Sequence, residues 1–192
     1  QNRKKGLCGG VAMYISDRIH WTRRKDLGWE EIECIWIEVF QKNAKSILVS
    51  TIYRPPLGIK YLSPDFSLLL EQMLLNVTEL AKETIILGDT NINYLIKEDN
   101  KDIKDIFKLY GLIQIIDKPT RISSTTKTLI DTIFTTDVMN IISKDVIPIS
   151  ISDHDLVGLV RKINHQKIPP RTIKCRNYSH YNADIMKEQL WV

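Results

Sequence analysis

Thr84-Ile85-Ile86-Leu87-Gly88-Asp89-Thr90-Asn91 is the segment on which the interpretation of the whole chain depends. Its apolar, mostly β-branched residues predict a short buried strand that ends at Gly88. An acid and an amide follow, at Asp89 and Asn91. A carboxylate at such a strand end can hold a hard cation or orient water, and an amide can hold a phosphoryl oxygen. Gly-Asp-Thr-Asn also fits an ordinary turn, because Gly, Asp and Asn all favour turns.

The composition predicts one globular domain. The chain has 192 residues, of which 43% are hydrophobic and 26% are charged, as is usual for such domains. No apolar run is long enough to predict a membrane span, so we expect no membrane partner. Cys8, Cys34 and Cys175 are odd in number and widely spaced. They fit neither a disulfide framework nor a zinc site, and they predict a reducing, intracellular compartment.

The positive charge is concentrated late in the chain. The net charge is +4 at pH 7, yet residues 161–176 hold six Lys and Arg residues and no acid. The rest of the chain is therefore close to neutral. A basic segment of this kind can follow a phosphate backbone, or it can be a solvated linker. The sequence leaves both interpretations open.

Three segments before the central strand predict further strands: Val11–Ile15, Ile32–Phe40 and Ile47–Tyr53. The second alternates well between two faces, and the third follows it at hairpin distance. Two prolines then stop ladder hydrogen bonding. Tyr53 and Arg54 are thus left at a strand end, where a phenol and a guanidinium can meet a phosphate. The alternative is that Tyr53 caps the core and Arg54 pairs with a surface acid.

Helices are predicted on both sides of the central strand. Ser63-Pro64-Asp65 has the residues of a helix start, and an apolar stripe from Phe66 to Leu80 follows it. A second helix is predicted at 102–110, before Gly111. A short strand is then predicted at 112–116, and further strands at Val146–Ile151 and Leu156–Val160. This order of strands and helices predicts an α/β domain of mixed sheets with helices outside.

Two further places carry polar residues that need an explanation. Asp131 lies within the apolar run Thr128–Phe134, and an unpaired buried carboxylate is costly. It therefore either faces solvent at an edge or pairs with a cation or an imidazole. Ser152-Asp153-His154 forms a turn between two predicted strands, and histidine exchanges its proton near neutral pH. A single histidine in a turn can equally be structural.

Five motifs occur together in a fixed order: Tyr53-Arg54-Pro55-Pro56, Gly88-Asp89-Thr90-Asn91, Pro119-Thr120-Arg121, Leu129-Ile130-Asp131 and Ser152-Asp153-His154. As an ordered set they resemble the endonuclease/exonuclease/phosphatase family, and more narrowly the apurinic-type endonuclease domain of non-LTR retrotransposons. The resemblance covers roughly residues 8–161. It implies a four-layer α/β sandwich of two mixed β-sheets flanked by helices, here incomplete at the N-terminus.

The resemblance implies metal-dependent phosphodiester hydrolysis, with Mg²⁺ (or Mn²⁺) as cofactor and DNA as partner. It implies that Asp89 orients or activates water and that Asn91 and His154 hold the scissile phosphate. Asp131 then pairs with His154, and Tyr53 supports the transition-state oxygens. A cation with fixed donors is suited to this reaction, because negative charge develops on the phosphoryl oxygens.

The same resemblance supplies the remaining assignments. Asp153 is expected near the metal. Thr120 and Ser152 match polar positions that contact the phosphate region, and Arg54 and Arg121 are the basic residues of two motifs expected to bind substrate.

One departure from the family pattern concerns the metal site. The family's N-terminal strands carry an Asn and a metal-binding Glu ahead of the segment that resembles Gly9-Gly10-Val11, and this chain begins at that segment. We therefore expect a weakened metal site and little or no nuclease activity. We expect an endonuclease-like domain at 1–161. Residues 162–192 are expected to be a basic linker and a short helix at 182–190 that leads towards a reverse transcriptase region. If the chain is a retroelement product, we expect it in the nucleus and the cytoplasm.

Three functions remain open at this point. The first is a DNA-nicking endonuclease domain. The second is a phosphoesterase of the same fold that acts on a small-molecule or lipid phosphate ester. The third is a non-catalytic remnant that binds nucleic acid through residues 161–176.

Overall fold

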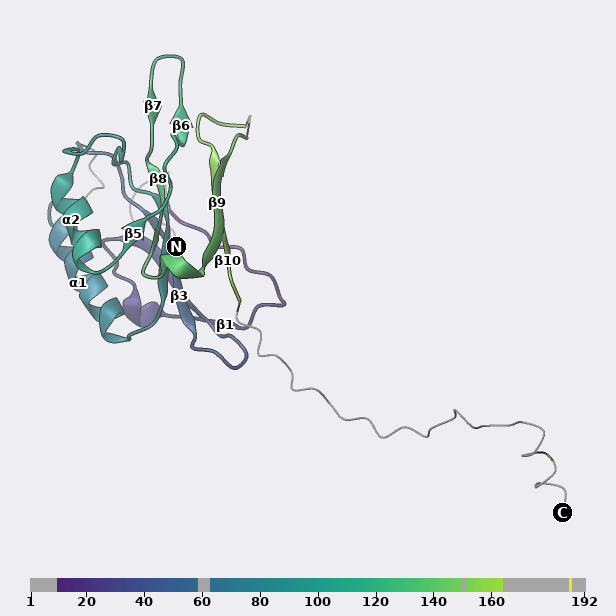
Figure 1. Ribbon diagram of the computed structural model, residues 1–192. Helices are drawn as coiled ribbons and strands as arrows, with labels where there is room; N and C mark the ends of the chain where they lie inside the picture. The colour runs from purple at the N-terminus through teal and green to yellow at the C-terminus, as the bar shows by residue number, and fades with distance from the viewer. Residues whose placement is uncertain (1–9, 59–62, 150, 164–186, 188–192) are drawn as a thin grey trace.

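The computed structural model describes residues 10–58, 63–149, 151–163 and Lys187. A six-stranded mixed sheet forms its centre (Figure 1). In spatial order its strands are β1 (Trp21–Arg23), β2 (Glu33–Val39), β3 (Ile47–Tyr53), β4 (Thr84–Asp89), β8 (Asp131–Thr135) and β5 (Ile113–Gln114).

Helices and a second sheet cover opposite faces of the central sheet (Figure 1). The helices are α1 (Phe66–Glu79) and α2 (Lys101–Leu109). The second sheet pairs β9 (Ile141–Ile147) with β10 (Leu156–Arg161). A projecting hairpin is made by β6 (Arg121–Ile122) and β7 (Lys127–Thr128), and two short 3-10 helices are η1 (Lys25–Leu27) and η2 (Val138–Asn140).

The alternating pattern in the first half of the chain produces a regular hairpin. Strands β2 and β3 pair antiparallel, from Glu33 opposite Tyr53 to Val39 opposite Ile47. Strand β4 then lies parallel to β3, and α1 makes the crossover between them. A parallel neighbour requires such a crossover. The predicted strands at 32–40, 47–53 and 84–87 are therefore confirmed, and the parallel pairing brings the ends of β3 and β4 together.

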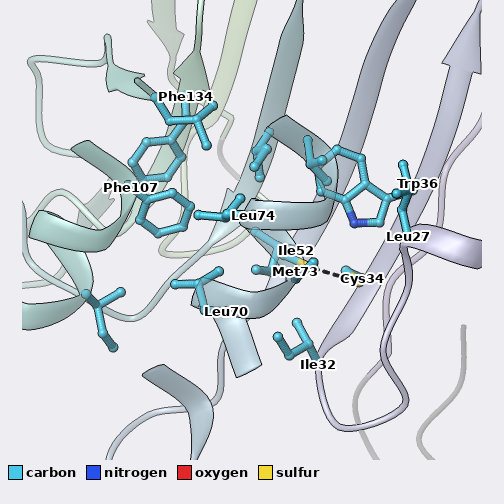
Figure 2. Packing of buried hydrophobic residues seen from close by; sticks show 14 of the residues in the cluster. Leu27, Ile32, Cys34, Trp36, Ile52, Leu70, Met73, Leu74, Phe107 and Phe134 are labelled. Carbon is cyan, nitrogen blue, oxygen red and sulfur yellow. Dashed lines mark hydrogen bonds between the residues drawn. The ribbon is translucent and has the colours of Figure 1, made fainter. Parts of the chain in front are cut away.

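The main core lies between the central sheet and the two helices. Leu70, Met73 and Leu74 of α1 pack against inward-facing strand residues, and the Cys34 thiol meets the sulfur of Met73 at 3.9 Å (Figure 2). Phe107 stacks on Phe134, with ring centroids 4.0 Å apart. The predicted apolar stripe of α1 is thus the core-facing side. The apolar stripe of α1 shares this core with Phe107 of α2, so both helices are packed on the central sheet.

A second core joins the two sheets. Ile85 and Ile133 of the central sheet are buried together with Leu129, and residues of β9 and β10 pack against them. At the end of β10, Arg161 donates from Nε and Nη2 to the two carboxylate oxygens of Glu83, each at 2.6 Å. Arg161 therefore ties β10 to the start of β4. Its charge, counted above in the basic segment, is already paired.

The α/β class with two packed sheets and outer helices is confirmed. Within the described residues, both α-helices lie on the same side of the central sheet (Figure 1). The strand predicted at Val11–Ile15 is wrong, because no strand is assigned to this segment. Strand β1 and the β6–β7 hairpin were not predicted, since each is only two or three residues long. Strand β8 begins at Asp131, later than expected.

Several expectations concern residues at the margins of the description. Cys34 is a free thiol, whereas Cys8 and Cys175 lie outside the described residues. The helix predicted at 182–190 also lies outside them, apart from Lys187, and so does most of the basic segment. In the part of the chain that is described, no helix has the length and apolar character to cross a bilayer.

Glu38 is a largely buried carboxylate with three side-chain donors. It accepts hydrogen bonds from Lys82, from Ser46 and from Arg24, the last at 2.7 Å, and its side chain is 8% exposed. The hydrogen bond from Lys82, then that from Ser46, hold its pKa at about 2, against an ordinary value of 4.5. The ionised carboxylate therefore stabilises the fold.

We expect Glu38→Gln to lower the free energy of unfolding at pH 7 by roughly 3 kcal/mol. Because the pKa is lowered on folding, this contribution is fully present above the unfolded value of 4.5 and is lost as the pH falls towards 2. The deficit of the variant should accordingly shrink through that window in urea titrations. Glu98→Gln is the control, since the Glu98–Lys101 pair is exposed and should contribute little. A constant deficit from pH 7 to pH 2 would contradict the assignment.

Candidate active site

Three chemically useful side chains meet at one end of the central sheet. Asp89 is the last residue of β4 and Asp131 is the first of β8, and the two are cross-strand partners. His154 comes from the turn that precedes β10. Ligand atoms of the three residues all lie within 4.8 Å of one another. His154 Nδ1 lies 3.0 Å from Asp131 Oδ2. The Asp131–His154 pairing implied by the sequence resemblance is therefore present, and it explains an acid within an apolar segment.

The turn that carries His154 is held by β6. Residues Arg121 and His154 form an isolated antiparallel bridge. The amide of Ile122 donates to the carbonyl of Asp153 at 2.9 Å, and the amide of Asp155 donates to the carbonyl of Thr120 at 2.7 Å. The β6–β7 hairpin therefore fixes the position of the imidazole relative to the two carboxylates.

Thr120 supports Asp131 directly. Its side chain is fully buried, and its hydroxyl donates to Asp131 Oδ2 at 2.7 Å. The hydroxyl oxygen of Thr120, Oγ1, accepts from the amides of Ile130 and Asp131 at 3.2 and 3.0 Å. Because Oγ1 already accepts from two amides, the hydroxyl hydrogen is directed to the carboxylate. Thr120 was expected to contact a phosphate, and the structure instead places it behind Asp131.

Asp89 and Asn91 form a tight turn. The amide of Asn91 donates to Asp89 Oδ1 at 2.9 Å, which is an Asx-type arrangement. Asn91 adopts the left-handed conformation with φ 49°, and its side-chain amide donates to the carbonyl of Arg54 at 2.9 Å. The two motif residues are therefore fixed relative to each other at the mouth of β4.

Tyr53 belongs to the same row of the sheet. It is opposite Asp89 in the β3–β4 ladder, and Asp89 is opposite Asp131 in the next one. Residues in one row point to one face, so the half-buried Tyr53 lies on the face of the two carboxylates. On its other side it pairs with Glu33, which accepts from the amide of Gly10 at 2.8 Å. A position for Glu33 beside Tyr53 was not predicted, although the register of the β2–β3 hairpin places the two residues opposite each other.

The remaining predicted residues are not brought into the cluster. Arg121 and Asp153 pair with each other at 2.7 Å, both about half exposed, and this guanidinium holds the pKa of Asp153 below its usual value. Asp153 was expected near a metal, yet it is not one of the three convergent groups. Ser152 is exposed, and its hydroxyl bonds within the His154 turn. Arg54 is only 2% exposed, so it does not present its guanidinium to a substrate.

The endonuclease-reverse transcriptase family model matches residues 47–157, which is more than half of the 192 residues. The chain belongs to this family. The resemblance inferred from the five ordered motifs is thereby confirmed, and the matched stretch contains Tyr53, Asp89, Asp131 and His154. No curated protein matches the chain.

Solved structures share the fold at low sequence identity. The endonuclease domain of TRAS1, a telomere-specific non-LTR retrotransposon, has a TM-score of 0.56 at 19% identity, over 72% of this chain and 64% of that one. An endonuclease/exonuclease/phosphatase family protein from Leptotrichia buccalis has a TM-score of 0.51 at 16% identity, over 68% and 53%. The chain thus spans less than two thirds of either structure's length.

The donor set of the cluster fits a hard divalent cation. Two carboxylates face each other across β4 and β8, and carboxylate oxygens are the ligands that Mg²⁺ prefers. Burial, and the nearby charge of Asp131, raise the pKa of Asp89 above its usual value. A bound cation would relieve both effects, because it offsets the lost hydration and the repulsion between the carboxylates.

Gly88 allows the strand ends to approach so closely. It has φ 152°, and a Cβ built at this position would lie 1.8 Å from the carbonyl oxygen of Ile52 in β3. Any side chain at this position would push β4 away from β3. The glycine of the Gly-Asp-Thr-Asn motif is thus required by the contact that sets Asp89 beside Tyr53.

We expect Gly88→Ala to destabilise the protein by about 3 kcal/mol or more, because the methyl group meets backbone that cannot yield. Gly111→Ala is the matched control. Gly111 also has a positive φ, 71°, but a Cβ there meets nothing within 4 Å, so only about 1–2 kcal/mol of backbone strain is expected. Chemical denaturation measures both. Equal losses in the two variants would show that the close approach at Gly88 is not limiting.

We expect Asp89→Asn to raise the unfolding midpoint at pH 7–8, by roughly 2–4 °C per kcal/mol gained. A carboxyl group whose pKa is raised on folding binds its proton more tightly in the folded state, so its ionisation lowers stability as the pH rises through the folded value. The advantage of Asn should disappear below the unfolded value of 3.8. Asp145→Asn is the control, because Asp145 is exposed and paired with Lys118, and it should give no gain. A variant less stable than the parent at pH 8 would contradict this account.

Proposed function

We propose that this domain hydrolyses phosphodiester bonds in DNA with a divalent cation, Mg²⁺ or Mn²⁺, as the endonuclease part of a retrotransposon product. The observation that supports it is the convergence of Asp89, Asp131 and His154 from three separate segments. The TRAS1 structure is the endonuclease domain of a telomere-specific non-LTR retrotransposon, and this likeness supports DNA over a small-molecule phosphate ester.

In this proposal Asp89 is the principal cation ligand and orients the attacking water. Asp153 becomes a further ligand if it exchanges Arg121 for the metal. When bound, the cation supplies positive charge to oxygens of the reacting phosphate. Asn91 holds the scissile phosphate when its side-chain amide exchanges Asp89 Oδ2, now 3.3 Å away, for a phosphoryl oxygen, and Tyr53 supports the oxygens that gain charge.

His154 acts through its second ring nitrogen. A hydrogen bond from Nε2 to a phosphate oxygen needs a hydrogen on Nε2. With Nδ1 donating to Asp131, this contact is made by the imidazolium, in which both ring nitrogens donate. Thr120 holds Asp131 from behind, so the acid keeps the ring in one orientation. The pair therefore serves as a fixed phosphate contact, and Thr120 is a positioning residue within it.

We expect weak metal binding and little or no nicking by this chain. The cluster supplies two carboxylates and one imidazole, and the imidazole is already engaged by Asp131. A reverse transcriptase as covalent neighbour, and a place of action in the nucleus and the cytoplasm, belong to the same proposal. They follow from the retrotransposon assignment.

The test combines Mn²⁺ binding, followed by electron paramagnetic resonance, with nicking of supercoiled plasmid in Mg²⁺. We expect Asp89→Ala to abolish Mn²⁺ binding and the exposed control Asp145→Ala to retain it. Any nicking above background should fall on the order of 100-fold in His154→Ala. Equal Mn²⁺ binding in the parent and Asp89→Ala, or nicking that survives His154→Ala, would overturn the proposed site. Robust nicking that Asp89→Ala removes would support the site and contradict the expected weakness.

A further inference from the structure

Arg54 is a buried cation directly behind the candidate active site. Its guanidinium lies over the ring of Phe66, with Cζ 5.4 Å from the ring centroid. Nη1 donates to the carbonyl of Thr90 at 3.3 Å, and Nη2 donates to Asn100 Oδ1 at 2.9 Å. Both acceptors are uncharged oxygens, and Nε has no hydrogen-bond partner among the described residues. Burial lowers the pKa of the guanidinium and outweighs the charges of Asp102 and Asp99, which favour its charged form. Burying a cation in this way is costly, so stability alone is a poor explanation for this residue.

The backbone of Arg54 binds the same loop. Its amide donates to the carbonyl of Asp89 at 2.9 Å, and its carbonyl accepts from the side-chain amide of Asn91 at 2.9 Å. Asp89, Thr90 and Asn91 are therefore each hydrogen-bonded to one residue. Arg54 thus fixes three consecutive residues of the loop.

The contact with Asn100 extends this support to β8. The side chain of Asn100 donates to Asp99, whose other oxygen accepts from the amide of Asn93 at 2.6 Å. Asn93 Oδ1 in turn accepts from the amide of Leu129 at 3.1 Å, two residues before Asp131. A continuous set of hydrogen bonds thus runs from Arg54 through the loop after β4 to the segment that carries the second carboxylate.

The guanidinium is suited to this place in a way that an ammonium group is not. Its planar fork donates in two directions at once and packs flat on an aromatic ring. Two residues of the loop, Asn91 and Asn100, adopt left-handed conformations with φ 49° and 45°, which asparagine tolerates better than most residues. Arg54 contacts both, through its carbonyl and through Nη2.

We propose that Arg54 is a positioning residue of the candidate active site, which fixes the loop Asp89–Asn91 and thereby sets the affinity of the site for its cation. The part that concerns the cation rests on the proposed function. The part that concerns the loop rests only on the contacts described.

The experiment compares Arg54→Lys with Arg24→Lys. Arg24 is a matched control, because it is also largely buried, is paired with Asp26 and Glu38, and follows the edge strand β1, beside Trp36 of β2. Amide hydrogen exchange of Thr90 and Asn91 is measured by NMR against that of Leu48 and of the buried strand β4 in the same variant. We expect Arg54→Lys to speed exchange at the two loop amides on the order of tenfold, and Arg24→Lys to leave them within about twofold. Uniform acceleration across the sheet in Arg54→Lys would overturn the proposal.

Mn²⁺ affinity provides the second readout. Loss of a residue that orients metal ligands commonly costs about tenfold or more in affinity, so we expect about tenfold weaker binding in Arg54→Lys and none of this loss in Arg24→Lys. If the parent chain binds no Mn²⁺, the proposed function fails while the exchange data still decide the role of Arg54. If Arg54→Lys speeds amide exchange in the loop but leaves the Mn²⁺ affinity unchanged, only the part of the proposal that concerns the cation is overturned.

Asn100→Gly is a second test variant, which keeps the proposal testable if Arg54→Lys does not fold. Glycine keeps the left-handed backbone conformation without strain and removes the acceptor of Nη2. We expect a smaller rise, a few-fold, in exchange at Thr90. If Arg54→Lys does not fold and Asn100→Gly leaves the loop unchanged, the proposal is refuted.

Discussion

The parallel pairing of β3 with β4 is the constraint from which the site follows. It places Tyr53 opposite Asp89, and the antiparallel pairing of β4 with β8 adds Asp131 to the same row. Because Gly88 has no side chain, β4 comes as close to β3 as the carbonyl of Ile52 allows. The site is thus an outcome of strand register, and only His154 has to be delivered from elsewhere, by the turn that β6 holds.

The stable parts of the molecule and its reactive parts follow different electrostatic rules. At the far end of the sheet, Glu38 is surrounded by donors and its charge stabilises the fold. At the site, Asp89 and Asp131 face each other with few cations nearby, and burial disfavours the charge on Asp89. The ionised carboxylates of Glu38 and Asp89, both on the central sheet, therefore have opposite effects on the stability of the fold. The difference lies in whether the protein or an external cation provides the compensation.

The sequence predicts what depends on local pattern and misses what depends on distant neighbours. Alternation at Ile32–Phe40 and Ile47–Tyr53 gave β2 and β3, since period-2 burial is local information. Val11–Ile15 has the same apolar character but no assigned strand, because β-propensity depends on context that composition does not reveal. For Asp131 the sequence left either solvent exposure at an edge or pairing with a cation or an imidazole, and the structure pairs it with His154. Arg54 was placed at the surface because the loop that covers it comes more than thirty residues later.

The Arg161–Glu83 pair has a mechanical consequence. It clasps the last residue of β10 to the residue that precedes β4, with two bonds of 2.6 Å. Tension applied to the chain beyond β10 would act on this ion pair together with the hydrogen bond from the Lys162 amide to the Asn140 carbonyl, at 2.7 Å. The His154 turn lies at the opposite end of the small sheet and is the last part that such tension would reach.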